Sequence, residues 1–374
     1  MAQKIKIAAA VAVLTVIITS VIFWILPNLP IKTQLEIDST KPAIIALWHV
    51  ETFEGGLGSR SDWLKRRALA FEKKYKGIYI DVCKLTYQQL INRLSEGYSF
   101  DLISFGGGVG YHLLNYIIPY EGALNTLDAL NKGGIINENQ YAVPYMAGGY
   151  ILAALKNNLT KISTFSSLTQ NVFDCGMVKK IGKNTVTLAS VACGFGQFNS
   201  PVTALAYNTA AKNKEGAAIF DNNVTQYGAY ENFLNNNKAT ILLGTQRDYY
   251  RLANRVSNGK LSEVEYAALS GYNDLIQYIS VGKTGDPIKT RYANLFVQYI
   301  TSNEAQTTIS GLFMLAAAKV NTYQDIIMTA LQNNLEYVKT PSVFAANNII
   351  EGLRTASEKC LFDGQKNLLK NYLC

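Results

Sequence analysis

Histidine and tryptophan are scarce in this sequence, and its cysteines are not clustered. The chain holds two histidines, His49 and His112, three tryptophans, and no CxxC pair or Cys/His cluster. A zinc site or a Ser/His/Asp triad would therefore have to use one of the two histidines. Since His49 belongs to an apolar run and His112 to an aromatic-rich segment, we expect structural roles for both. We predict no metal, no cofactor and no catalytic residue.

Charged residues are also few, at 17% of the chain, although the net charge is +8. Lys and Arg are dispersed, and no long basic block interleaved with aromatic residues appears, so we expect no nucleic-acid partner. The 23 tyrosines and the Asn runs stand out instead. Both residue types suit a polyhydroxylated ligand, but they also suit solvated loops and strand edges.

The nucleotide-binding loops of the common α/β enzymes are missing. No GxxxxGK followed by Ser or Thr occurs, and SFGGGVGYH approaches the dinucleotide fingerprint only loosely. We interpret these glycines as turns that need positive φ angles.

The five cysteines are widely spaced and odd in number. Cys175 and Cys193 could pair outside the cell, but we expect buried free thiols instead.

The N-terminus carries a long uncharged run. Twenty residues, from Ile7 to Leu26, follow Lys4 and Lys6 without a charge. About 20 apolar residues span a bilayer, and preceding positive charge places the remainder of the chain outside the cytoplasm. We predict an uncleaved anchor at the cell membrane within residues 1–33, with a cleaved signal peptide and secretion as the alternative. No cysteine near its end could carry a lipid.

Strand and helix patterns alternate after residue 42. The runs AIIALWHV, IYIDV and FDLISF are typical of buried strands, and two helical patterns between them start at Ser61 and Thr86 and close at Gly77 and Gly97. This βαβαβ order predicts parallel strands, with ligands beyond their carboxyl ends. Pro144 and the pair Gly148–Gly149 then indicate a crossing between lobes, and 374 residues favour about two domains.

The loop ETFEGGLGSR follows the first of these strands, so we expect it to form the lip of a cleft. Glu51 and Glu54 could contact a ligand, or could pair with Arg60 and stiffen the loop. Paired carboxylates also serve glycoside cleavage, which ranks well behind both.

Several segments together resemble one family. They are LWHVETFEGGLGSRSDWLKRRALAFEKKYKGIYIDV, FDLISFGGG, YAVPYMAGGYIL, FLNNNKATILLGTQRD and IKTRYANLFVQYITSNEAQ. In this order and spacing, over nearly all of residues 43–355, they are similar to extracellular solute-binding proteins of the maltose-binding type, the receptor components of ATP-driven sugar importers. Asn237 before Lys238, in place of a usual Gly, and the missing lipid-attachment cysteine are departures from the pattern.

The resemblance implies an α/β, two-lobed periplasmic-binding-protein-like fold of type II behind the N-terminal transmembrane or signal segment. Lobe I would comprise residues 41–142 plus 266–318, and lobe II residues 143–265 plus 319–374. A solute would bind between the lobes by hinge closure, without catalysis. The implied partners are a sugar or similar solute and the ABC permease subunits in the membrane, with the receptor itself a monomer.

The resemblance also implies a set of ligand-binding residues, drawn from the loops of both lobes. They are Glu51, Phe53, Glu54, Arg60, Gly107, Gly108, Tyr111, Tyr145, Gln246, Arg247 and Asp248, with Gly106 and Thr245 beside them. Carboxylates and Arg form charge-assisted hydrogen bonds to hydroxyls, and rings stack on sugar faces. A membrane-anchored sensor or adhesion module of the same fold, and a glycoside-acting enzyme, remain alternatives.

Overall fold

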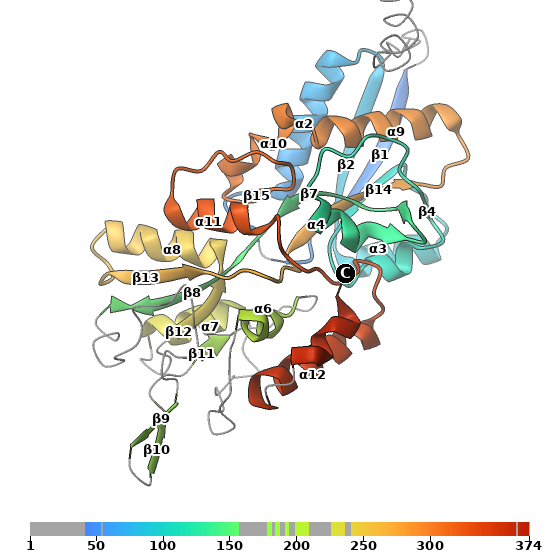
Figure 1. Cartoon of the computed structure of the whole chain (residues 1–374). Coiled ribbons are helices and arrows are strands. Elements are labelled where there is room, and N and C mark those ends of the chain that lie inside the picture. Colours follow the sequence, from blue (N-terminus) through green and yellow to red (C-terminus); the bar gives the residue numbers. More distant parts are fainter. Residues whose placement is uncertain are drawn as a thin grey trace, which may run out of the picture. The chain divides into compact units, whose positions relative to one another are not determined.

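The strands of the chain gather mainly into two β-sheets, one of seven strands and one of four (Figure 1). The computed structural model describes residues 42–53, 55–156, 178–181, 184–187, 191–193, 199–208, 226–235, 241–363 and 366–373. Further short elements within these ranges are α4 (Asp128–Asn131), α10 (Asn303–Gln306), β5 (Ile135–Ile136), β6 (Asn139–Gln140), β9 (Val178–Ile181), β10 (Asn184–Thr187), η2 (Gly110–Leu113), η3 (Lys132–Gly134), η5 (Ile309–Leu312) and η6 (Lys366–Tyr372).

The larger sheet has a parallel centre. Strand β1 (Ala43–Val50) lies between β2 (Ile78–Leu85) and β3 (Leu102–Phe105) and runs parallel to both, so the predicted βαβαβ order is confirmed. Three later strands and β4 complete a mixed sheet, because β14 runs antiparallel to β3. Their bounds are β4 (Ile117–Ile118), β7 (Val143–Ala147), β14 (Ile276–Gly282) and β15 (Leu315–Ala316).

Local capping fixes where the first helices begin. The hydroxyl of Ser59 accepts a hydrogen bond from the Asp62 amide, so Ser59 is the N-cap of α2 (Arg60–Lys74). The cap predicted at Ser61 is wrong, because the observed cap lies two residues earlier. Thr86 caps α3 (Tyr87–Ser95) as predicted, in a reciprocal capping box with Gln89. Helix α9 (Pro287–Ile300) lies beside α2 and packs on β1 and β14 (Figure 1).

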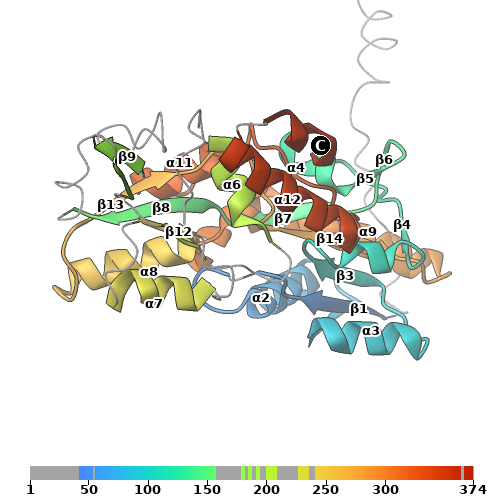
Figure 2. The same cartoon turned by 90° about the horizontal axis from the view of Figure 1, so that it is seen from below.

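The smaller sheet follows the order β11-β12-β8-β13. Its strands are β11 (Val191–Cys193), β12 (Ile241–Thr245), β8 (Tyr150–Leu155) and β13 (Val264–Ala268). Figure 2 shows α7 (Gln226–Asn235) and α8 (Gln246–Ser257) beside β12, and both helices contact that strand. Phe233 and Leu252 are fully buried there and contribute to the core.

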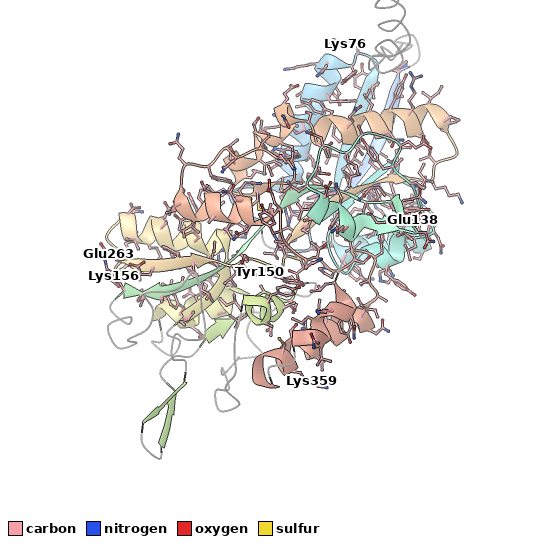
Figure 3. The ribbon with its side chains drawn as sticks, viewed as in Figure 1. Lys76, Glu138, Tyr150, Lys156, Glu263 and Lys359 are labelled. Carbon is pink, nitrogen blue, oxygen red and sulfur yellow. The ribbon has the colours of Figure 1, made fainter. Side chains whose placement is uncertain are left out.

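Two segments cross between the sheets. The predicted crossing at Gly148–Gly149 joins β7 of the larger sheet to β8 of the smaller one. The second, between β13 and β14, contains Asp274, whose carboxylate accepts hydrogen bonds from the Tyr150 and Tyr272 hydroxyls and the Ser200 amide. Figure 3 marks Tyr150 at the start of β8. Burial raises the pKa of Asp274. The exact lobe boundaries stay a prediction.

The C-terminal part is largely helical, as predicted. Helices α11 (Ile326–Asn334) and α12 (Asn347–Asp363) follow β15, and α12 packs against α6 (Pro201–Asn208) (Figure 2). A hydrogen bond of 2.7 Å between the hydroxyls of Thr203 and Ser357 joins these two helices. Residues Thr40–Cys374 form one compact unit.

The predicted anchor, residues 7–26, lies outside the described residues, as does Cys175. Within the described ranges, no helix combines the length and the apolar character that a membrane span requires. Neither Cys83 nor Cys360 forms a disulfide bond.

Gln306 ties α10 to β7 and to the segment after β15. Its side chain is fully buried, donates to the carbonyls of Tyr145 and Ile300, and accepts from the amides of Ala317 and Ala318. We expect Gln306→Leu to lower the free energy of unfolding by about 3 kcal/mol or more, because it leaves buried backbone groups without partners. Urea denaturation measures this. Gln298→Leu, on the exposed side of α9, is the matched control; equal losses in both variants would contradict the role of Gln306.

Candidate functional site

A polar cleft opens beside the carboxyl end of β1, where the sequence predicted it. Its volume is about 530 Å³. The loop after β1 forms most of the wall, the end of β2 adds one residue, and two more come from the segments that begin α6 and α8. The lining residues are Glu51, Thr52, Phe53, Gly55, Gly58, Ser59, Arg60, Lys84, Asn199 and Arg247. Elements of both sheets therefore contribute to one cavity.

Arg60, the first residue of α2, is the most enclosed charge in this wall, with 3% of its surface exposed. Its guanidinium donates to the carbonyl of Phe53 and, at 3.3 Å, to the side chain of Gln277. The guanidinium also covers the Phe53 ring, 4.4 Å from the ring centroid. Its Nε lies 3.9 Å from the Glu51 carboxylate. Arg60 thus holds the loop against β14.

Glu51 faces two cations and one imidazole. Its carboxylate lies 2.7 Å from Lys84 Nζ and 3.6 Å from His49 Nε2. The side-chain contacts with His49 and Lys84, together with the charge of Arg60, lower the pKa of Glu51 to about 2. Burial alone would raise this pKa, but its effect is smaller than theirs combined. For His49, burial has the opposite effect and lowers the pKa, so this imidazole is neutral at pH 7. Glu51 is therefore ionised over the physiological pH range.

A chain of buried hydrogen bonds continues below the cleft. His49 Nδ1 lies 2.9 Å from the Ser104 hydroxyl, which in turn lies 2.8 Å from the Tyr145 hydroxyl. The Gln277 amide donates to the same Ser104 hydroxyl and to the Val50 carbonyl. This chain fixes the ends of β1, β3, β7 and β14 relative to one another, so the cleft rests on an ordered floor.

The glycine loop docks on the segment before β15. The Leu57 amide donates to the Leu312 carbonyl at 2.5 Å, and the Gly56 amide donates to Met314 Sδ at 2.9 Å. A Cβ atom on Gly56 would lie 2.0 Å from the Leu312 carbonyl oxygen, which explains the need for glycine. Gly55 and Gly58 line the cleft, and because they have no side chains their backbone is accessible from it.

Four of the predicted ligand residues lie together at the cleft, namely Glu51, Phe53, Arg60 and Arg247. Glu54 lies outside the described residues. The structure places the other six elsewhere. Gly107 and Gly108 line a separate small cavity beside Asp274, and Tyr111 is half exposed in η2.

Tyr145, Gln246 and Asp248 are buried and bonded within the protein. Tyr145 is fully buried and stacks on Trp63, with ring centroids 5.8 Å apart, and burial raises the pKa of its hydroxyl. Gln246 accepts from the Gly149 amide and donates to Met314 Sδ. Asp248 caps α8 by accepting from the Thr245 amide. Their proposed contact with a ligand stays a prediction that this arrangement does not favour.

Lys84, Asn199, Thr52 and Ser59 line the cleft although the sequence analysis did not select them. Lys84 had a usable signal: β1 and β2 are parallel, and their register pairs His49 with Lys84, which brings the lysine beside Glu51. Asn199 had none, because the residues before it carry no distinct pattern. No group of three or more metal-ligating side chains occurs in the part of the chain that the structure describes.

The lowered pKa of Glu51 predicts a pH-dependent stability. Ionised Glu51 stabilises the fold above its unfolded pKa of about 4.5, and this contribution disappears as the pH falls toward about 2. We expect Glu51→Gln to lower the free energy of unfolding by up to about 3 kcal/mol at pH 6, and the difference from the parent protein to shrink below pH 4.5. Urea denaturation across pH 2–7 measures this.

Glu304→Gln serves as control, because Glu304 is 63% exposed in its pair with Lys74. Exposed pairs contribute little. A Glu51→Gln difference that stays constant from pH 6 to pH 2 would contradict the assignment.

Comparison with solved structures identifies the fold. A sugar-binding protein MalE from the phytopathogen Xanthomonas citri has a TM-score of 0.60 at 13% identity, over 88% of this chain and 95% of that one. The GacH receptor of Streptomyces glaucescens, solved unliganded and with acarbose, has a TM-score of 0.56 at 15% identity, over 88% and 99%. A cyclic alpha-maltosyl-1,6-maltose binding protein from Arthrobacter globiformis has a TM-score of 0.60 at 11% identity, over 88% and 96%.

No protein-family model matches the sequence, and no curated protein matches it either. At 11–15% identity these three structures establish the architecture. The fold expected from the sequence resemblance is thereby confirmed: the chain has the mixed α/β, type II periplasmic-binding fold of MalE-like proteins.

Proposed function

We propose that this chain is an extracytoplasmic receptor that binds a carbohydrate solute and presents it to the permease subunits of an ABC importer. The observation that carries the proposal is the polar cleft, which draws side chains from elements of both sheets in a fold shared with sugar-binding proteins. Carboxylate, guanidinium, ammonium, amide and hydroxyl groups all face it. Sugar hydroxyls both donate and accept hydrogen bonds, so such a lining satisfies them.

The same site argues against glycoside hydrolysis. A glycosidase needs a carboxylic acid whose pKa is raised so that it can donate a proton to the leaving group. The neighbours of Glu51 instead lower its pKa to about 2 and keep it ionised. Among the described residues that line the cleft, Glu51 is the single carboxylate. Binding without catalysis is the function that this environment favours.

Location outside the cytoplasm is part of the proposal and rests on the sequence. Lys4 and Lys6 precede the apolar run of residues 7–26, which favours transfer of the following residues across the membrane. An anchored receptor would remain close to its permease, which raises the local concentration of the solute-loaded form.

A thermal-shift screen of the full-length chain in mild detergent tests solute binding. The panel contains neutral sugars, sugar acids, sugar phosphates and polyols, with amino acids and peptides as the contrasting classes. We expect a carbohydrate at 100 times its dissociation constant to add ~2.7 kcal/mol to the stability of the folded state, and so to raise the Tm by a few degrees. Stabilisation by amino acids or peptides alone, or by no compound of the panel, would argue against a carbohydrate receptor.

Closure of the cleft is a second expectation. Because the lining residues come from elements of both sheets, a bound solute should draw the sheets together about the two crossing segments. We expect the radius of gyration of the compact unit, residues 40–374, to fall when a stabilising sugar is added at saturation, as measured by small-angle scattering. A sugar from the panel that does not shift the Tm provides the control. Superimposable profiles with and without the binding sugar would rule out closure.

A further inference from the structure

Positive charge dominates the cleft. Arg60, Lys84 and Arg247 line it, and Glu51 is the one carboxylate among its described lining residues, so three cations and one anion leave a net charge of +2. Glu51 is already engaged, at 2.7 Å from Lys84 and 3.9 Å from Arg60. Glu54 belongs to the same loop in sequence but lies outside the described residues, and counting its carboxylate would still leave one excess cation.

Two helix starts add to the positive potential. Arg60 is the first residue of α2 and Arg247 the second residue of α8, so each helix directs its N-terminal end at the cleft. The aligned peptide dipoles place a partial positive charge at each helix N-terminus. Arg247 also contributes to lowering the pKa of Arg60, after the larger effect of burial, so these two guanidinium groups repel one another. An anion between them would relieve that repulsion.

Two buried polar atoms at the cleft lack partners. Asn199 is 2% exposed and Thr52 is 9% exposed, and Asn199 Oδ1 and Thr52 Oγ1 make no hydrogen bond. Buried polar atoms are normally satisfied, so each points to a missing ligand or water. Asn199 Oδ1 accepts hydrogen bonds and thus suits a hydroxyl, whereas the Thr52 hydroxyl can also donate to an anionic oxygen.

The described lining residues include no exposed aromatic ring on which a sugar could stack. Phe53 is the one aromatic residue among them, and the Arg60 guanidinium covers its ring. Trp63 is buried in its stack on Tyr145, and Trp48 is buried beneath Arg93. Affinity must therefore come from charge and hydrogen bonds more than from stacking.

We propose that the solute is an acidic saccharide, whose carboxylate or phosphate group binds between Arg60 and Arg247 while its hydroxyls bind Asn199 and Thr52. This inference rests on the proposed carbohydrate receptor and names its substrate class. Lys84 neutralises Glu51, which would otherwise repel the acidic group. Carboxylate and phosphate share the guanidinium-binding geometry on which the proposal depends.

Matched pairs of sugars test the proposal on the full-length chain. Glucose and galactose are compared with glucuronate, galacturonate and their oligomers, and with glucose 6-phosphate, by calorimetric titration. We expect at least one acidic sugar to bind tenfold or more tightly than its neutral counterpart, with an affinity that falls as salt is raised. Preference for the uronates identifies a carboxylate ligand, and preference for the phosphate identifies a phosphoryl ligand.

Substitution of Arg247 locates the acidic group. Arg247 is half-buried, so Arg247→Gln should fold, whereas Arg60→Gln would disturb the loop. We expect Arg247→Gln to weaken binding of the acidic sugar roughly tenfold or more. Arg255→Gln removes one positive charge from the same helix, at a residue that does not line the cleft, and should leave binding within about twofold.

The outcomes separate this inference from the proposed function. If neutral sugars bind as tightly as their acids, or if Arg247→Gln and Arg255→Gln bind the acid equally well, the acidic-solute inference is wrong while the carbohydrate receptor stands. If no sugar of either kind binds, the proposed function fails and the inference fails with it.

Discussion

The buried guanidinium of Arg60 is the constraint around which the cleft is organised. A charge with 3% exposure is costly unless hydrogen bonds and counter-charges surround it. Here the partners come from three places: the Phe53 carbonyl in the loop, the Gln277 side chain in β14 and the Glu51 carboxylate at the end of β1. The loop must therefore fold back over the start of α2. Its path is set by the charge it encloses.

The consequences extend through the floor of the site. Gln277, which accepts from Arg60, also donates to Ser104, and Ser104 lies within hydrogen-bond distance of both His49 and Tyr145. Each of these groups is fully buried or nearly so. A solute would meet a wall whose main charge is already held in place, and little side-chain entropy would be lost at Arg60 on binding. Lys84 is 53% exposed, so it has more freedom to lose.

Periodicity and capping predicted much of the fold. The three opening strands and the two helices between them follow from apolar runs and helical spacing, and Thr86 was a correct cap because Gln89 completes its box. Ser61 was a wrong cap because Gly58, with a φ of 72°, turns the chain early and leaves Ser59 in the extended conformation that a cap needs. The antiparallel β14 could not be predicted from local pattern, since strand direction depends on where the chain returns.

Residues at the site were harder to predict than the loops that contain them. Gln246, Arg247 and Asp248 are consecutive, and successive helical residues point about 100° apart. Consequently Asp248 turns back to cap Thr245, Gln246 reaches the crossing at Gly149, and Arg247 alone faces the cleft. The Thr-x-x-Asp pattern of a capping box could have separated Asp248 from the ligand set, since a side chain that caps a helix already has a hydrogen-bond partner within the protein.

The tyrosines raise the same problem. Tyr145 and Tyr150 have the hydroxyls that suit a sugar, yet Ser104 and Asp274 engage them inside the protein. Composition therefore indicates the kind of chemistry that a chain can offer, whereas the partners of each group decide which residues remain available to a solute.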